Sequence, residues 1–187
     1  MDRESAWALV EEYAQSDRLI KHCTAVEAAM RAYARKVGED EEVWGIAGML
    51  HDFDWDACPS DEQHPQFGAD ILRERGYPDV IVRAVLSHGN HTGVPRESIM
   101  EKALFAMDEL SGFVTAVTLV RPSKSLSDTD PRAVRKKMKD KAFARNVNRD
   151  DLSQGAQDLG VDLDELIEFV VESLKPVAGQ LGLAPSD

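Results

Sequence analysis

The apolar residues of this chain recur every three to four positions, which is the period of an amphipathic helix. The strict alternation of apolar and polar residues that is typical of a half-buried strand is absent from the sequence. The pattern predicts helices over residues 5–15, 17–37, 40–52, 64–75, 79–88, 97–120, 132–141, 150–159 and 162–181. We therefore expect an all-α protein, built as a helical bundle.

The second predicted helix carries the clearest end signals and the first residue of chemical interest. Asp17 is the expected N-cap and Gly38 the expected C-cap. Leu19, His22 and Val26 share one stripe of this helix, so His22 is predicted to point inward. A core histidine with ordinary hydrogen-bond partners remains a competing interpretation, because histidine is only intermediate in its preference for burial.

Length and composition predict one folded domain over residues 1–187. A chain of 187 residues, 43% hydrophobic and 30% charged, has enough apolar surface for a sizeable core. The cysteines, Cys23 and Cys58, form no CxxC pair, which favours a reducing compartment over a disulfide framework. No signal-peptide layout and no long apolar run occur, so we expect a cytoplasmic protein that does not enter membranes.

The net charge bears on the partners of the protein. A formal charge of −12 and a pI near 4.8 repel nucleic acids and anionic membranes, so neither is expected as a partner. Residues 121–149 reverse the sign locally, with ten basic residues against three acidic ones. Arg121 and Lys124 follow the helix of residues 97–120 most closely, and we expect them to bind a substrate phosphate. A solvated helix face is the competing interpretation of the segment.

The strongest chemical signal is the doublet His51-Asp52, at the end of the apolar helix of residues 40–52. An adjacent imidazole and carboxylate can bind one hard or borderline cation together. All histidines precede residue 92, and they are His22, His51, His64, His88 and His91. Asp108 follows within an apolar helical run, where a buried carboxylate needs a cation or hydrogen-bond donors to compensate for lost solvation. We therefore expect a site for one or two metal ions.

Each of these residues also has a simpler interpretation. A His-Asp doublet is often a solvated helix end, and His64 at a helix start faces either solvent or the site. His88 completes the apolar face of residues 79–88, whereas His91 belongs to a glycine-rich loop that suits either a substrate contact or a flexible helix end. Asp108 suits an internal cap or salt bridge as well as a metal.

The ordered pattern of His22, then His51-Asp52, then Asp108 on successive helices resembles the HD superfamily of metal-dependent phosphohydrolases. The resemblance covers about residues 18–120, and it implies that these four residues bind one metal. Members with two metals add histidines between the doublet and the last Asp, which His64 and His88 match, with His91 as a further candidate. In those members the carboxylate of the doublet bridges the metals. Here Phe53-Asp54 follows the doublet in place of Ile-Gly, which leaves the subfamily open.

The resemblance implies an activity and a division of the chain. A metal-activated water would attack a phosphomonoester or phosphodiester of nucleotide size, with Asp52 as the catalytic residue. The cofactors would be one or two divalent ions, drawn from Fe, Mn, Ni, Co, Zn and Mg. The glycine-rich loop around His91 and the basic charge after residue 120 add the expectation that bound substrate contacts His91, Arg121 and Lys124. Residues 18–120 would form the metal-binding core, and the helices of residues 121–187 would pack on it.

Two other function classes fit the same residues. A di-iron oxygenase can use a ligand set of histidines and carboxylates to activate dioxygen. A non-catalytic module could keep the pocket to sense a ligand, although the complete ligand set argues against a degenerate site. A small phosphorylated molecule is the expected partner under the favoured interpretation.

Overall fold

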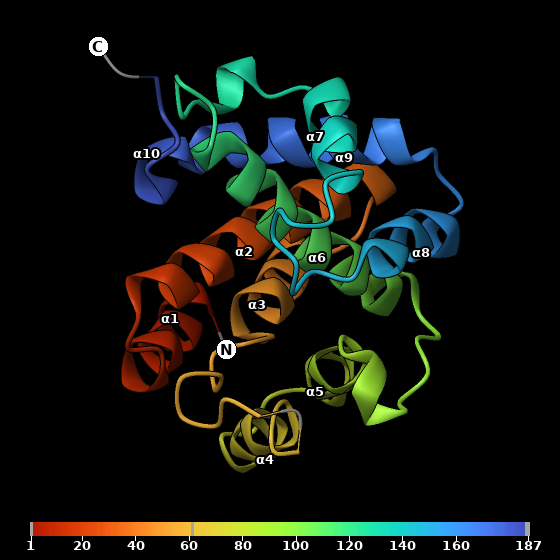
Figure 1. The fold of residues 1–187 in the computed structure, drawn as a ribbon. Coiled ribbons are helices and arrows are strands. Elements are labelled where there is room, and N and C mark those ends of the chain that lie inside the picture. Colours follow the sequence, from red (N-terminus) through yellow and green to blue (C-terminus); the bar gives the residue numbers. More distant parts are fainter. Residues whose placement is uncertain (1, 61, 186–187) are drawn as a thin grey trace.

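The computed structural model of the chain describes residues 2–60 and 62–185, and all regular structure within them is helical. The helices are α1 (Arg3–Tyr13), α2 (Asp17–Val37), α3 (Glu41–Leu50), α4 (Gln66–Glu74), α5 (Asp79–Ser87), α6 (Ile99–Leu119), α7 (Pro131–Met138), α8 (Arg149–Leu159), α9 (Leu163–Leu174) and α10 (Ala178–Leu181) (Figure 1). Short 3-10 turns are η1 (Asn90–Thr92), η2 (Leu126–Asp128) and η3 (Lys175–Val177). The predicted all-α fold is confirmed.

The ends of α2 show how local side chains define a helix. The Ser16 hydroxyl accepts a hydrogen bond from the Leu19 amide, at 3.3 Å, so Ser16 is the N-cap and the assignment to Asp17 was wrong by one residue. Asp17 lies in the first turn and pairs with Lys21 at 2.7 Å. Gly38 ends the helix with φ of 78°, as predicted, because glycine adopts this left-handed conformation without steric cost.

Prolines account for two differences between the predicted and observed helices. Helix α4 begins at Gln66, so Pro65 precedes it as the N-cap residue and does not occupy its first turn. The helix predicted over residues 162–181 is divided into α9, η3 and α10. Pro176 lies in η3, where it offers no amide hydrogen to continue the α-helical bonding of α9.

Close packing of α3 against α2 brings the first histidines together. A Cβ atom added to Gly48 would lie 2.9 Å from the Val26 carbonyl oxygen, so this glycine lets the two backbones approach closely. The doublet at the end of α3 is thereby placed beside the middle of α2.

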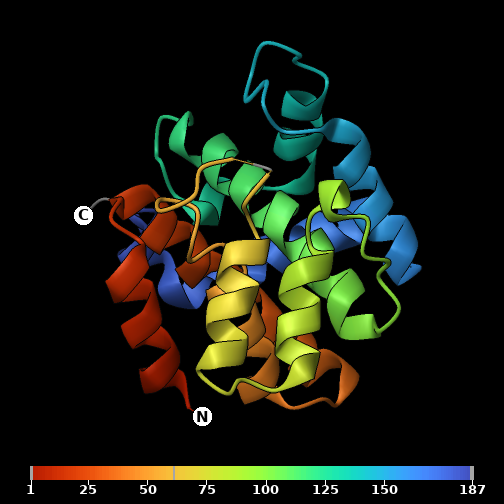
Figure 2. The ribbon, with the colours of Figure 1, turned by 90° about the horizontal axis from the view of Figure 1, so that it is seen from below.

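Helix α6 lies at the centre of the bundle and supplies its longest buried face, which includes Leu104, Met107, Leu110 and Phe113. It contacts α2, α3 and α5 as well as α8 and α9. Helices α4 and α5 lie side by side (Figure 2). The contacts of α8 and α9 place the last part of the chain against α6, while a single domain over residues 1–187 stays a prediction.

None of the helices in the described ranges is both long and apolar enough to span a bilayer.

Candidate metal centre

Three side chains from different helices meet in a first group, which we call cluster 1: His22 of α2, His51 directly after α3, and Asp108 of α6. The Nε2 atom of His22 lies 2.9 Å from Asp108 Oδ1 and 3.1 Å from His51 Nε2. The Nε2 atom of His51 lies 3.4 Å from the same Asp108 oxygen. Cluster 1 therefore joins the predicted first histidine, the histidine of the doublet and the last aspartate.

A second group, which we call cluster 2, consists of Asp52, His64 and His88. The Oδ1 atom of Asp52 lies 3.1 Å from His64 Nε2 and 3.2 Å from His88 Nε2. The two histidine nitrogens are 3.3 Å apart. His64 precedes α4 and His88 directly follows α5, so the pairing of these helices brings their histidines together.

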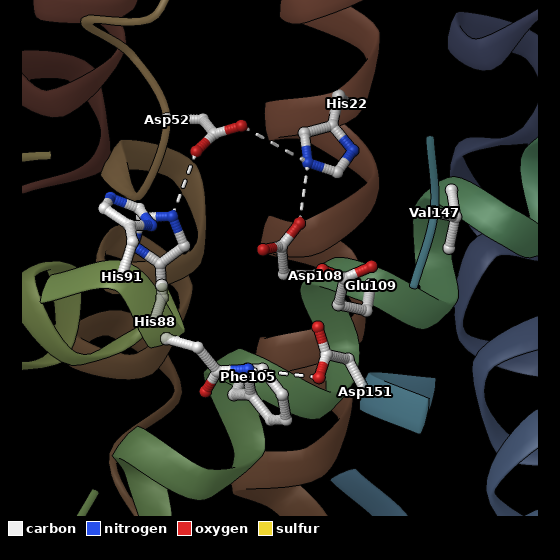
Figure 3. A pocket seen from close by; sticks show the side chains of 11 residues that line it. His22, Asp52, His88, His91, Phe105, Asp108, Glu109, Val147 and Asp151 are labelled. Carbon is white, nitrogen blue, oxygen red and sulfur yellow. Dashed lines mark hydrogen bonds and ion pairs between the residues drawn. The ribbon is translucent and has the colours of Figure 1, made fainter. Parts of the chain in front are cut away.

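Asp52 faces both clusters, because its two carboxylate oxygens point in different directions. While Oδ1 belongs to cluster 2, Oδ2 lies 3.6 Å from His51 Nε2 and 3.8 Å from His22 Nε2. Figure 3 shows Asp52 between His22 and His88, with one oxygen directed to each side. The geometry allows a single carboxylate to serve an ion in each cluster.

Backbone carbonyl groups orient two of the histidine rings. The Nδ1–H of His51 donates to the Gly48 carbonyl at 2.7 Å, and that of His88 donates to the Val85 carbonyl at 2.6 Å. In both cases the acceptor lies three residues earlier, on the last turn of the helix that the histidine follows. These bonds assign the proton to Nδ1 and leave the Nε2 lone pair directed into the cluster.

The third anchored ring, His64, is held by a carboxylate that sequence reasoning did not identify. The Nδ1–H of His64 donates to Asp54 Oδ1 at 2.8 Å, and Asp54 Oδ2 accepts the Gly68 amide at 2.9 Å. Asp54 is fully buried, although the acidic composition of residues 53–63, with Pro59 among them, predicts a loop. A carboxylate at Nδ1 raises the basicity of Nε2, which strengthens a histidine as a metal ligand. The sequence signal that could have identified Asp54 was its position in Phe53-Asp54, directly after the doublet, where the family pattern has Ile-Gly.

The donor atoms fit divalent ions. With their protons on Nδ1, His51, His64 and His88 direct the lone pairs of Nε2 at carboxylate oxygens. The lone pairs and the oxygens repel each other unless a proton or a cation lies between them. Two atoms bound to one ion at about 2.1 Å lie about 3.0 Å apart at octahedral angles and about 3.4 Å apart at tetrahedral angles. The separations of 2.9–3.4 Å in cluster 1 and 3.1–3.3 Å in cluster 2 match this range.

When no ion is bound, protons on the histidines compensate for the negative charge of the carboxylates. Burial disfavours the charged form of His51, but the Asp52 and Asp108 carboxylates outweigh it and raise its pKa to about 9. Burial is likewise outweighed at His64, where hydrogen bonds to Asp52 and Asp54 raise the pKa to about 10. Burial also opposes the ionisation of Asp52 and Asp108, yet the facing histidines lower the pKa of both carboxyls. A metal ion must therefore displace protons to bind.

A cavity of about 440 Å³ opens onto the clusters. Its lining includes His22, Asp52, His88 and Asp108 from the clusters, and Asn90, His91, Phe105, Glu109, Val147 and Asp151 beyond them (Figure 3). Burial and then the Asp108 and Asp151 carboxylates raise the pKa of Glu109 to about 8. A cation bound at Asp108 would oppose that rise. The cavity thus has a metal-binding wall and a second, acidic wall.

His91, which we predicted as a substrate contact, does line the cavity. Its Nε2 atom is 2.8 Å from the His64 carbonyl oxygen and donates to it. This bond keeps the ring outside both clusters and ties η1 to the segment that carries His64. Substrate contact by His91 stays a prediction.

Arg121 and Lys124 are not brought to the cavity. Arg121 lies more than three helical turns beyond Asp108, after the end of α6, and neither residue lines the cavity at the clusters. The predicted phosphate contacts of these two residues therefore gain no support. Arg18 and Lys21, which the sequence did not single out, line a neighbouring cavity of about 290 Å³ together with His22. The count of basic residues along the sequence therefore did not identify Arg18 and Lys21, which are the basic side chains beside the site.

The basic segment of residues 121–149 reaches the cavity through Val147 alone. Arg149 fixes the loop before α8, donating to the Ala144 carbonyl at 2.7 Å and to the Val147 carbonyl at 2.6 Å. Its guanidinium also lies over the Phe113 ring, 4.8 Å from the ring centroid. These contacts make Arg149 a structural tie of this loop.

Comparison with protein families matches the chain to the family described as HD domain, over residues 19–112. The match spans half of the chain and contains every residue of clusters 1 and 2. It ends before the basic segment and before α8, which supplies part of the acidic wall of the cavity.

Similar curated proteins match through part of their length. The chain is 29% identical over 94 residues to Ribonuclease Y of Lactobacillus gasseri, covering 50% of this chain and 17% of that protein. It is 31% identical over 99 residues to Ribonuclease Y of Oleidesulfovibrio alaskensis, covering 52% and 18%. It is 32% identical over 87 residues to a tRNA (cytidine(56)-2'-O)-methyltransferase of Thermoplasma volcanium, covering 46% and 25%. The chain thus spans a quarter or less of these relatives, and no solved structure matches it.

Proposed function

The chain belongs to the HD domain family, and from this premise we propose that it is a metal-dependent phosphohydrolase. The proposed ligands are His22, His51 and Asp108 for one ion and His64 and His88 for a second, with Asp52 shared between them. The name Ribonuclease Y denotes hydrolysis of a phosphoric ester, which supports this reaction class. The methyltransferase name denotes a different reaction, so the substrate is argued from the site.

One observation carries the proposal: the carboxylate of Asp52 presents one oxygen to each cluster. A carboxylate shared in this way is suited to hold two ions close to each other. When bound, divalent ions lower the pKa of a water molecule and stabilise negative charge on phosphoryl oxygens. Asp52 is therefore the residue whose loss should affect metal binding and turnover together.

The surrounding protein supports hydrolysis of a small substrate. His51, His64 and His88 are buried, whereas Asp52 and Asp108 are partly exposed, so the carboxylates form the edge of the centre that a substrate can reach. The cavity of about 440 Å³ lies within the usual range for small-ligand sites. A nucleotide-sized phosphate ester suits this volume, with its phosphoryl group at the clusters and its organic part in the cavity.

The test compares Asp52→Ala with Asp70→Ala, an exposed aspartate of α4. Metal content is measured after loading with Mn, Fe, Co, Ni, Zn or Mg, and phosphate release is measured on a panel of phosphomonoesters, phosphodiesters and nucleotides. We expect Asp52→Ala to lose bound metal and more than about 100-fold in turnover, while Asp70→Ala matches the wild type. Unchanged metal content and turnover in Asp52→Ala would refute the proposal.

The same assay separates the competing functions. Oxygen consumption without phosphate release would identify the di-iron oxygenase class, which can use the same nitrogen and oxygen ligands. Ligand binding with no turnover of either kind would identify a sensing module. The full set of donor atoms in both clusters favours catalysis over sensing.

A further inference from the structure

The wall of the cavity opposite the clusters carries two carboxylates that the proposed metal centre does not use. Glu109 follows Asp108 on α6, and its carboxylate forms no hydrogen bond or ion pair with another described residue. Asp151 reaches the same cavity from the first turn of α8. Figure 3 shows both side chains at the cavity, on the side away from Asp52. The organic part of a substrate that occupies this cavity therefore lies beside them.

Asp151 is held in position by a chain of side-chain contacts. The side-chain Nδ2 of Asn90 donates to Asp151 Oδ1 at 3.1 Å, and the side-chain Oδ1 of Asn90 accepts from Arg96 Nη2 at 2.8 Å. Arg96 in turn donates to the Ser87 carbonyl at 3.1 Å, and its guanidinium stacks 3.8 Å from the centroid of the Phe105 ring. The contacts join η1, α6 and α8, and the Asn90 side chain anchors one oxygen of the Asp151 carboxylate at the cavity.

The charges around the cavity restrict what can bind. The described residues that line it include no lysine and no arginine. Asp52, Asp108, Glu109 and Asp151 supply four carboxylates, and two divalent ions would balance their charge. The ions can bind one phosphoryl group at the clusters. A second phosphate in the cavity would instead face Glu109 and Asp151 without a cation to neutralise it.

Resting on the proposed function, we infer that the cavity selects phosphomonoesters whose organic part is uncharged or cationic and carries hydroxyl or amino groups. Glu109 and Asp151 accept hydrogen bonds from those groups, and they exclude substrates that carry a second phosphate. In the reaction, a bond forms between a water oxygen and phosphorus while the ester P–O bond breaks. One water proton ends on the leaving oxygen, so the products are an alcohol and inorganic phosphate.

Four substrates of similar length test this selection in the metal-loaded protein: glycerol phosphate, aminopropyl phosphate, propyl phosphate and propanediol bisphosphate. At the end away from the ester phosphate they carry, in the same order, hydroxyl groups, an ammonium, a methyl group and a second phosphate, and this end faces the acidic wall. A site that accepts hydrogen bonds from substrate discriminates strongly against analogues without the donor. We expect kcat/KM for the first two to exceed that for propyl phosphate by about 10-fold or more, with the bisphosphate the poorest.

The variants Glu109→Gln and Asp151→Asn remove the charge with little change in shape. In both, metal content should stay at the wild-type level, the advantage of aminopropyl phosphate should shrink, and the bisphosphate should improve relative to propyl phosphate by about 5-fold or more. Glu168→Gln and Asp70→Asn are matched controls on exposed positions of α9 and α4, and they should leave every ratio unchanged.

Two failures are distinguishable. If the protein hydrolyses the esters but the ratios of kcat/KM between substrates are the same in wild type, Glu109→Gln and Asp151→Asn, this inference is overturned and the proposed function stands. A wild-type preference for the bisphosphate would do the same. No phosphate release from any ester with any metal would overturn the proposed function, and this inference with it.

Discussion

Clusters 1 and 2 have the same ligand chemistry but differ in how firmly the protein holds them. In cluster 2 the side chains of His64 and His88 are 3% and 6% exposed, and Nδ1 of each ring is fixed by Asp54 or by a backbone carbonyl. In cluster 1 the side chain of His22 is 22% exposed, and its Nδ1 has no hydrogen-bond partner among the described residues. Cluster 2 is preorganised, whereas the His22 ring of cluster 1 is held only by contacts within the cluster itself.

Two sites with the same ligand types can differ in metal affinity when their outer hydrogen bonds differ. Outer hydrogen bonds to ligating histidines typically change metal affinity by about 10- to 100-fold. We therefore expect cluster 2 to fill first and to hold its ion more tightly. The more open cluster 1, whose His22 and Asp108 line the cavity, is expected to exchange its ion more readily.

Removing one ligand from each cluster should produce unequal losses. His64→Ala should empty cluster 2, lower turnover by more than about 100-fold and weaken metal binding at both clusters through the shared Asp52. His22→Ala should leave cluster 2 occupied, so one ion per chain remains. Metal content by mass spectrometry and phosphate release measure both. Identical metal loss in the two variants would contradict the asymmetry.

Replacing the outer carboxylate should make the clusters more alike. Asp54→Asn keeps the shape of the side chain but removes the charge that makes His64 more basic, so affinity at cluster 2 should fall by about 10- to 100-fold. Titration calorimetry with Ni²⁺ or Mn²⁺ measures the two affinities separately. Asp70→Asn serves as the control, because Asp70 is exposed on α4. Unaltered affinity in Asp54→Asn would show that Asp54 supports the fold alone.

Metal binding should strengthen as pH rises. The pKa values of about 9 at His51 and about 10 at His64 mean that both rings of the metal-free protein are protonated at neutral pH. A metal ion must displace these protons, so apparent affinity should increase from about pH 7 and level off above about pH 9 to 10. Calorimetry in buffers of different protonation enthalpy counts the protons released. No release at neutral pH would contradict the assignment of these rings as ligands.

The smallest effect should come from crowding Asp54. A Cβ atom added to Gly68 would lie 2.8 Å from Asp54 Cγ, so Gly68→Ala must shift that carboxylate. We expect a several-fold loss of affinity at cluster 2 and a destabilisation of about 1–3 kcal/mol from overpacking. Gly179→Ala is the matched control, because a Cβ there meets no atom within 4 Å. Equal metal binding in the two variants would show that the position of Asp54 is not critical.

The helices and the first ligands were predictable because their signals are local. A helical period identifies helices directly, and caps such as Gly38 identify their ends within a residue or two. Asp108 drew notice because a carboxylate within an apolar run needs compensation. The resemblance placed His64 and His88 as candidates for a second ion, and the structure brings both rings to one oxygen of Asp52.

The remaining features depend on contacts that no local pattern encodes. The composition around Asp54 predicts a solvated loop, and its burial becomes apparent only when α4 packs above it and the Gly68 amide reaches its carboxylate. The acidic wall joins Glu109 and Asp151, which lie on different helices. Arg121 and Lys124 follow Asp108 closely in the sequence, but α6 separates them from it in space, since both residues lie beyond the end of this helix.

The shared role of Asp52 can be tested most directly by electron paramagnetic resonance of the protein loaded with Mn²⁺. Two ions that share the Asp52 carboxylate should give the spectrum of an exchange-coupled pair at two equivalents of metal. His22→Ala should give the spectrum of a single uncoupled ion. A single uncoupled ion in the wild type at saturating metal, or a spectrum unchanged by Asp52→Ala, would contradict the account.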